Sequence, residues 1–205
     1  LTGGFRADLN TDTRAAFSPR AVVVFRPYEN QAFRLGYGLA FRKPSHFESR
    51  VHIRVEDTAF PEIRAVMEEQ LGNEDLVNEQ VHSIEAGWRG SFLDDELETS
   101  IDLFFNMYRD TITFVVDLPF RMGLPDIQNS PVQFENSGDE LNVLGGEARL
   151  AWNPLPELSL WCNVGLRRVI NRDSSDELYG ELHGEPLIRL NFGGRYLPAS
   201  GWVLD

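Results

Sequence analysis

Alternation of apolar residues with small or charged residues dominates the chain, and it is most regular over residues 33–41. The odd positions of this stretch are Phe33, Leu35, Tyr37, Leu39 and Phe41. The even positions hold only arginine, glycine and alanine. A period of two predicts a β-strand, because a helix would scatter these apolar residues around its circumference. About ten such residues is the length that a tilted strand needs to cross the hydrocarbon core of a bilayer.

The same alternation predicts about nine strands in total. They are expected at 1–9, 20–26, 33–42, 81–92, 97–107, 144–152, 158–167, 188–196 and, as an interrupted strand, 202–205. A short helix is expected at 61–71, because Pro61 lies in its first turn and Gly72 lies just past its end. The apolar stretch 112–120 either extends the preceding strand or folds back as a hairpin.

The connections between these strands differ in length in a regular way. Short turns are expected at 26–31, 93–96, 153–157 and 197–201, and long connections at 43–79, 109–137 and 170–184. One end of the sheet therefore carries tight turns and the other carries large loops, as in transmembrane β-barrels. Aromatic residues on the apolar side border the short turns, where an interfacial girdle would lie. They are Phe25, Phe33, Phe92, Trp152, Tyr196 and Trp202.

A soluble β-sandwich also alternates apolar and polar residues, so alternation alone does not identify a membrane protein. Strand length, one-sided loop length and the aromatic border favour the barrel. Open sheet edges are not tolerated in lipid, because unpaired backbone groups there cost several kcal/mol each. We therefore expect a fragment of a longer barrel, and the absence of a starting methionine before Leu1 agrees with that expectation.

Charge, cysteine content and hydropathy exclude several classes of protein. The net charge of −13 makes nucleic acid an unexpected partner, because phosphate contacts need a basic surface. The single cysteine, Cys162, excludes an internal disulfide framework and falls on the apolar side of its strand. No run of about 18 apolar residues predicts a membrane helix.

No catalytic, metal or cofactor site is predicted. The four histidines, His46, His52, His82 and His183, lie in or beside the long connections without metal-ligand spacing. Acidic loop residues could bind Ca²⁺ through their oxygens, although no EF-hand spacing supports this hypothesis. They are Glu68, Glu69, Glu74, Asp75, Asp173, Asp176, Glu177 and Glu181.

The side of the sheet opposite the apolar one carries the candidate functional residues, which would face the lumen of a barrel. They are Arg34, Arg42, Glu85, Arg89, Glu98, Asp102, Glu147, Arg149, Arg189 and Arg195. One interpretation is a cross-strand charge ladder that stabilises the wall and meets a plug. The other is direct contact with an anionic solute or ferric chelate.

Several stretches resemble TonB-dependent outer-membrane receptors. They are Phe17–Pro27, Glu29–Glu48 with its Ala-Phe-Arg-Lys-Pro-Ser segment, Ile84–Gly90, Leu97–Asp110, Asn136–Leu150, Trp152–Leu160 and Arg195–Trp202. Their order and spacing carry the resemblance, which covers most of the chain outside the three long connections. The resemblance implies an antiparallel up-and-down barrel of about 22 strands with a plugged lumen. This chain, residues 1–205, would supply later strands, with one short helix in a long loop.

The resemblance also implies a function. The parent protein would be a bacterial outer-membrane receptor that takes up a scarce solute, such as a ferric siderophore, cobalamin or a glycan. Its partners would be outer-membrane lipid, a plug domain, an energy-transducing periplasmic protein and the solute, and no bond would be made or broken. Two alternatives remain open: a passive porin-like channel and a soluble carbohydrate-binding β-sandwich. The loops that would choose the solute carry no recognised motif, so the sequence does not name it.

Overall fold

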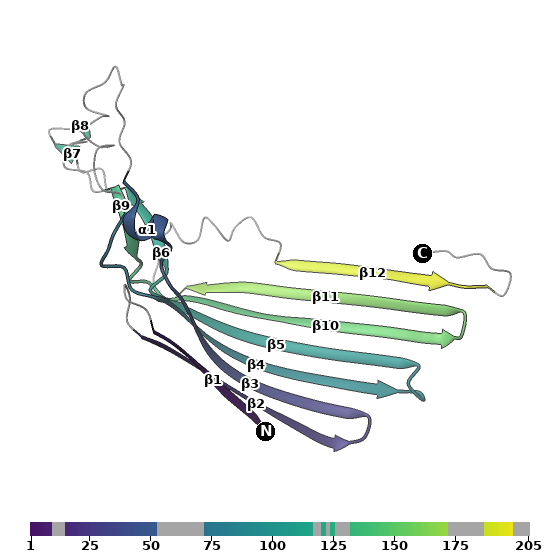
Figure 1. The fold of residues 1–205 in the computed structure, drawn as a ribbon. Helices are drawn as coiled ribbons and strands as arrows, with labels where there is room; N and C mark the ends of the chain where they lie inside the picture. The colour runs from purple at the N-terminus through teal and green to yellow at the C-terminus, as the bar shows by residue number, and fades with distance from the viewer. Residues whose placement is uncertain are drawn as a thin grey trace.

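Eight long strands form one antiparallel sheet, in the order β1-β2-β3-β4-β5-β10-β11-β12 (Figure 1). The computed structural model describes residues 1–9, 15–52, 72–116, 120–121, 124–125, 132–171 and 187–198. The strands of the sheet are β1 (Thr2–Asp8), β2 (Ala16–Tyr28), β3 (Gln31–Arg42), β4 (Glu79–Phe92), β5 (Leu97–Arg109), β10 (Leu141–Leu155), β11 (Leu158–Asn171) and β12 (Ile188–Tyr196). This order confirms eight of the expected strands; the ninth, 202–205, lies outside the described residues.

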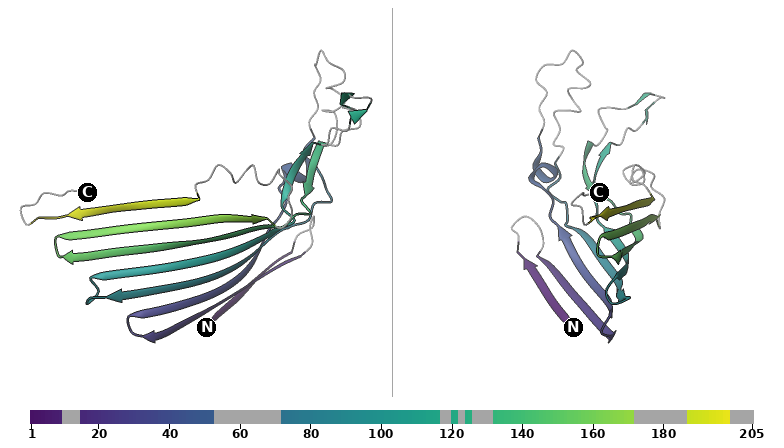
Figure 2. Two further views of the ribbon diagram at one scale, coloured as in Figure 1. Left: turned by 180° about the vertical axis from the view of Figure 1, so that it is seen from behind. Right: turned by 90° about the vertical axis from the view of Figure 1, so that its right-hand side faces the viewer.

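Each strand of the sheet pairs with the next one along the chain, except that β5 pairs with β10 across an inserted segment. The pairing is in register, so residues line up in rows that cross the sheet. Leu35, for example, lies opposite Ala86, which lies opposite Leu103. Residues in one row point to the same side, because side chains alternate along every strand. The sheet is curved when viewed from the end (Figure 2, right).

The sheet therefore has an apolar face, which carries the odd residues of β3, and a charged face, which carries Arg34. No second layer of described residues covers the apolar face. Phe33, Leu35 and Tyr37 remain 43%, 57% and 40% exposed. The few buried apolar side chains are Ala16, Leu76, Leu141 and Val143, and no described side chain is completely buried. A soluble sandwich would instead seal its apolar face against another sheet.

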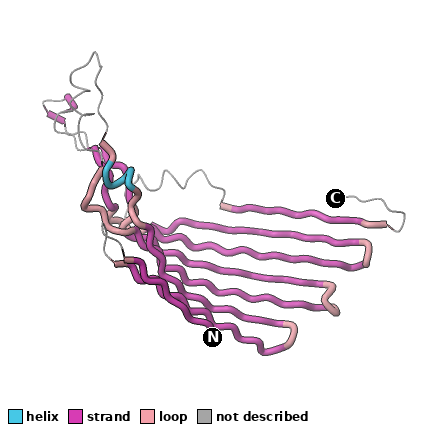
Figure 3. The backbone as a smooth tube through the Cα atoms, in the orientation of Figure 1, coloured by secondary structure: helices cyan, strands magenta, loops and turns pink. Residues whose placement is uncertain are grey.

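Two of the short turns are tighter than the sequence predicts. Strand β2 continues to Tyr28 and β10 to Leu155, so the expected turns 26–31 and 153–157 shrink to two residues each. Pro27 and Pro154 caused the error, because proline usually marks a turn. Both prolines lie where the register shifts, and a missing backbone N–H is tolerated at such a bulge. The turn 93–96 is as predicted (Figure 3).

The described parts of the long connections lie beyond the opposite end of the sheet (Figure 1). Strand β6 (Ile112–Val116) leaves the sheet and pairs with β9 (Val132–Asn136), which settles the apolar stretch 112–120 in favour of a hairpin. Two short strands, β7 (Phe120–Arg121) and β8 (Leu124–Pro125), also pair. The helix expected at 61–71 lies outside the described residues.

Helix α1 (His46–Arg50) lies within the expected connection 43–79 and was not predicted. The Ser45 hydroxyl accepts a hydrogen bond from the backbone N–H of Glu48, and the Glu48 carboxylate accepts one from the backbone N–H of Ser45. This capping box satisfies N–H groups that the first turn of a helix otherwise leaves unpaired. Among the described residues, no helix is both long enough and apolar enough to span a membrane.

Candidate functional site

The centre of the charged face is a row of residues that crosses the sheet from β3 to β12. In order, the row contains Arg34, Gly87, Asp102, Glu147, Gly165 and Arg189. Four of the ten candidate residues therefore share a single row. Strand alternation predicted their common side, and the register brings them level with one another.

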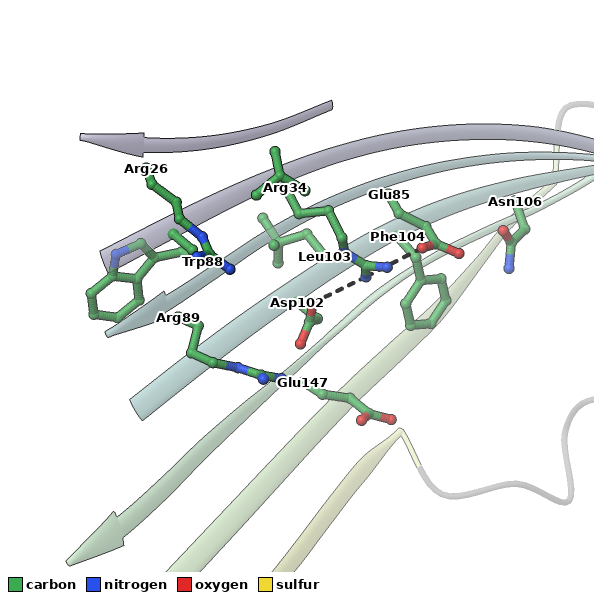
Figure 4. A pocket seen from close by; sticks show the side chains of 13 residues that line it. Arg26, Arg34, Glu85, Trp88, Arg89, Asp102, Leu103, Phe104, Asn106 and Glu147 are labelled. Carbon is green, nitrogen blue, oxygen red and sulfur yellow. Dashed lines mark hydrogen bonds and ion pairs between the residues drawn. The ribbon is translucent and has the colours of Figure 1, made fainter. Parts of the chain in front are cut away.

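Arg34 forms ion pairs with two carboxylates, Asp102 in this row and Glu85 in the next row on the charged face. Its Nη2 atom lies 3.3 Å from Asp102 Oδ1 and 3.3 Å from Glu85 Oε2. Figure 4 shows Arg34, Glu85 and Asp102 pointing toward one another from β3, β4 and β5. All three side chains are at least 38% exposed. Exposed pairs of this kind contribute at most about 1 kcal/mol each, so the cluster orders the charges more than it stabilises the sheet.

Gly87 makes the Arg34–Asp102 contact possible. The two residues are on strands that do not pair with each other, and Gly87 of β4 lies between them. A Cβ atom at Gly87 would lie 2.5 Å from Asp102 Oδ1 and 3.5 Å from Arg34 Nε. Any other residue here would therefore intrude on the path of the ion pair.

A hollow of about 760 Å³ surrounds this cluster on the charged face. Arg26, Arg89 and Glu147 line it together with the three ion-paired residues (Figure 4). Within the part of the chain that the structure describes, Arg26, Arg89 and Glu147 form no ion pair. The hollow thus presents charged groups of both signs that remain available to a ligand or to another domain.

A second row, nearer the short turns, contains two further candidates. Arg89 and Arg149 lie on either side of Ser100, about 10 Å apart at the backbone by strand spacing. Arg149, like Arg89, has no ion-pair partner among the described residues. This row continues to Asn163 and Asn191. It offers cationic and amide groups suited to an anionic or hydroxyl-rich surface.

The remaining candidates lie apart from this centre. Glu98 is near the short turns, opposite Ser91 and Ala151, and Arg195 lies opposite Ser159. Arg42 is at the loop end of β3, about 26 Å along the strand from Arg34. There its guanidinium binds Glu79 and forms two hydrogen bonds of 3.0 and 3.1 Å to Glu48. The ten residues therefore do not form one site.

Sequence reasoning missed the partners of Arg42. Glu48 and Glu79 both fall within the expected long connection 43–79, and nothing in their spacing links them to Arg42. Burial raises the pKa of the Glu48 carboxyl, but hydrogen bonds from Arg42 and Ser45 outweigh this effect and hold that pKa below its ordinary value. Glu48 is thus charged at neutral pH.

Two aromatic residues on the charged face, Phe104 and Trp161, pack over glycines of neighbouring strands, and the sequence did not predict this packing. The Phe104 ring lies over Gly145, where a Cβ atom would be 2.3 Å from the ring. The Trp161 indole covers Gly193 in the same way, at 2.5 Å. Each ring fills the gap that a strand glycine leaves, a pairing known to stabilise sheets.

The apolar face carries the other residues singled out in the sequence. Cys162 lies there, opposite Leu150 and Phe192. His82 is in β4, beside the long connection as expected, and its Nδ1 lies 3.0 Å from the Tyr37 hydroxyl. The five described residues of the aromatic border are on this face near the short turns; Trp202 lies outside the described residues.

The described residues do not form a metal site. None of their histidine, cysteine and carboxylate groups gather in threes that could hold a metal ion. Of the acidic residues considered for Ca²⁺, Glu74 lies 3.7 Å from Arg50 Nε. Asp75 receives no support as a ligand, and the other six lie outside the described residues.

Comparison with known proteins agrees with this geometry. Residues 1–204 match the family model described as TonB dependent receptor-like, beta-barrel. The chain is similar to the siderophore receptor PirA from Pseudomonas aeruginosa, with 19% identity and a TM-score of 0.68 over 97% of this chain and 34% of that one. It is also similar to PirA from Acinetobacter baumannii, with 17% identity and a TM-score of 0.58 over 91% and 27%.

A third similar structure is a mutant ferric enterobactin receptor, PfeA, from Pseudomonas aeruginosa in complex with enterobactin. It shares 18% identity and a TM-score of 0.67 over 95% of this chain and 28% of that one. No curated protein sequence matches the chain. The chain thus spans about a third or less of the length of these receptors, and the likeness to them shows the fold.

Proposed function

Because the chain belongs to the family of TonB-dependent receptor β-barrels, we propose that it is part of the wall of an outer-membrane receptor for active uptake of a scarce solute. The family consists of transport receptors of the outer membrane, so catalysis is not part of this function. A ferric siderophore is the preferred solute class, because the similar structures are described as siderophore receptors. Cobalamin and glycans are the other solutes considered.

One observation carries the membrane assignment: the apolar face is uncovered along the length of the sheet. Leu35 at the middle of β3 is 57% exposed. Its row continues the apolar surface across the sheet through Leu103, Leu166 and Ile188, which are 54%, 53% and 63% exposed. Monomeric soluble proteins rarely expose a continuous apolar surface of this extent. Contact with lipid removes the surface from water, and pairing of β1 and β12 with further strands of the receptor satisfies their backbone edges.

The charged face then faces the interior of the barrel. Interior residues contact either the plug domain or the passing solute, and the hollow around Arg34 supplies groups for both. The ordered cluster of Arg34, Glu85 and Asp102 suits a fixed contact with charged groups of the plug. Arg89 and Arg149, which have no carboxylate partner among the described residues, suit an anionic solute.

Energised uptake separates this proposal from a passive porin-like channel. Cells that lack their other siderophore receptors are given the full-length receptor, and uptake of a labelled ferric siderophore is measured with and without the energy-transducing partner. We expect uptake only when the partner is present. Uptake that continues without the partner would instead favour the passive channel.

The role of the charged face is tested in the same cells. Combined Arg89→Glu and Arg149→Glu substitutions should reduce uptake at least several-fold without lowering the amount of receptor in the outer membrane. The matched variant with lysine at both positions keeps the charges and should retain most of the uptake. Equal uptake by both variants would remove these arginines from the solute path.

The soluble carbohydrate-binding alternative receives no support. Family membership and the uncovered apolar face both count against it. A monodisperse monomer in water without detergent would revive it.

A further inference from the structure

The bases of two long connections are joined by the side chain of Asn136, the last residue of β9. Its Oδ1 accepts a hydrogen bond of 2.8 Å from the backbone N–H of Val77. Its Nδ2 donates to the backbone oxygens of Val77, at 3.1 Å, and of Asp110, at 2.6 Å. One amide thus links the hairpin β6–β9 to the segment that precedes β4.

Further contacts join the same two regions. Asn73 Nδ2 donates to the backbone oxygen of Phe134 at 2.9 Å, and the Ile112 N–H donates to Glu79 Oε1 at 2.7 Å. The Phe47 ring of α1 meets the Phe134 ring edge-on at 5.7 Å. These contacts are spread over both strands of the hairpin, so the hairpin is held at several points.

Helix α1 and the segment 72–79 are also tied to each other. The backbone N–H of Gly72 donates to Val51 O at 2.9 Å, and that of Asn73 donates to Glu48 O at 3.0 Å. A Cβ atom at Gly72 would lie 2.5 Å from the backbone nitrogens of Arg50 and Val51, so the two segments approach as closely as glycine allows. Arg42 then connects Glu48 to the end of β3.

We propose that α1, residues 72–79 and the hairpin β6–β9 form one cooperative body, the loop base, which opens as a unit and in which Asn136 is the joining residue. Segments that share hydrogen bonds and packing open together rather than separately. The role of the loop base rests on the proposed function: it holds the starts of two solute-facing connections in fixed positions relative to each other. Such pre-organisation lowers the conformational entropy lost when a solute is captured.

The test is hydrogen–deuterium exchange of the full-length receptor in lipid nanodiscs, without solute or energy source. Asn136→Ala is compared with Gln133→Ala, a control on the same strand. Among the described residues, the Gln133 amide bonds only to Glu135 of that strand, at 2.6 Å. The reporters are the backbone amides of Ser49, Val51, Gly72 and Asn73, because each donates to a group other than Asn136. Amides of β4 and β5 show whether the sheet remains folded.

We expect Asn136→Ala to accelerate exchange about tenfold or more at these reporters and in the hairpin together, and Gln133→Ala to leave the reporters unchanged. Acceleration confined to the hairpin and Val77 would overturn the proposal. If Asn136→Ala prevents assembly of the barrel, Asn136→Asp is used instead, since it keeps the Oδ1 acceptor and removes both N–H donors of Nδ2. Faster exchange at the reporters would again support the proposal, and faster exchange confined to the hairpin and Val77 would overturn it. The result does not depend on uptake, so failure here is distinct from failure of the proposed function.

Discussion

Two neighbouring valines on β2 provide a matched test of which face meets lipid. Val23 is on the apolar face opposite Leu35, and Val22 is on the charged face opposite Gly36. Both lie near the middle of a 13-residue strand. The same substitution, valine to lysine, therefore places the same charge at the same depth on opposite sides of the sheet.

The expected magnitudes differ strongly. A lysine on the lipid face near the bilayer midplane destabilises a barrel by roughly 2–4 kcal/mol. On the charged face the new ammonium lies near Glu85, because a Cβ at Gly36 would lie 3.8 Å from both Glu85 Cβ and Val22 Cγ2. An exposed pair of this kind is worth at most about 1 kcal/mol, so Val22→Lys should change stability by no more than that.

The assay is reversible urea unfolding of the full-length receptor in phospholipid vesicles, followed by tryptophan fluorescence. Val23→Lys should lower the unfolding free energy by at least about 1 kcal/mol more than Val22→Lys, which is about a fivefold or larger difference in the folded-to-unfolded ratio. Equal losses, or a larger loss for Val22→Lys, would refute the assignment of the faces.

Three further results are expected. Gly145→Ala should destabilise by about 1–3 kcal/mol in the same assay, because its Cβ would lie 2.8 Å from the backbone oxygen of Leu166 as well as against Phe104. Gly87→Ala should destabilise less, about 1 kcal/mol or below, because the intruded atom is a carboxylate oxygen that can swing away, and a loss equal to that of Gly145→Ala would contradict this account. The Glu48 carboxyl has a lowered pKa in the folded state, so its contribution to the stability of α1 should be complete above about pH 4.5 and disappear as the pH falls through the folded-state pKa. Hydrogen exchange at the amides of Ser49 and Val51 between pH 7 and pH 3.5 would show this loss of stability, and Glu48→Gln should flatten its pH dependence.

The two faces could be predicted from sequence because side-chain alternation along a strand is fixed by backbone geometry. The assignments of Arg34, Asp102 and Glu147 to one side needed nothing more. The ion pair between Arg34 and Asp102 could not be predicted, because it depends on the register of β3, β4 and β5 and on Gly87 falling between the two residues. Register depends on where the turns begin and end, and Pro27 and Pro154 made two turns appear longer in the sequence than they are.

The loop base could be predicted only in part. Ser45 and Glu48 have the spacing of a capping box, a signal that could have revealed α1. The helix has only five residues, too few to show apolar periodicity. Nothing local links Asn136 to Val77, which is 59 residues away, so that contact required the structure.

The central claim is that the apolar face of the sheet meets hydrocarbon, and nitroxide scanning of β3 tests it most directly. Single cysteines are introduced at each position from 33 to 41 in a Cys162→Ser background of the full-length receptor, and each is labelled in lipid vesicles. Collision with oxygen dissolved in the bilayer should be highest at the odd positions and lower at each even position. Odd positions shielded from bilayer oxygen, or the absence of any alternation, would contradict the account.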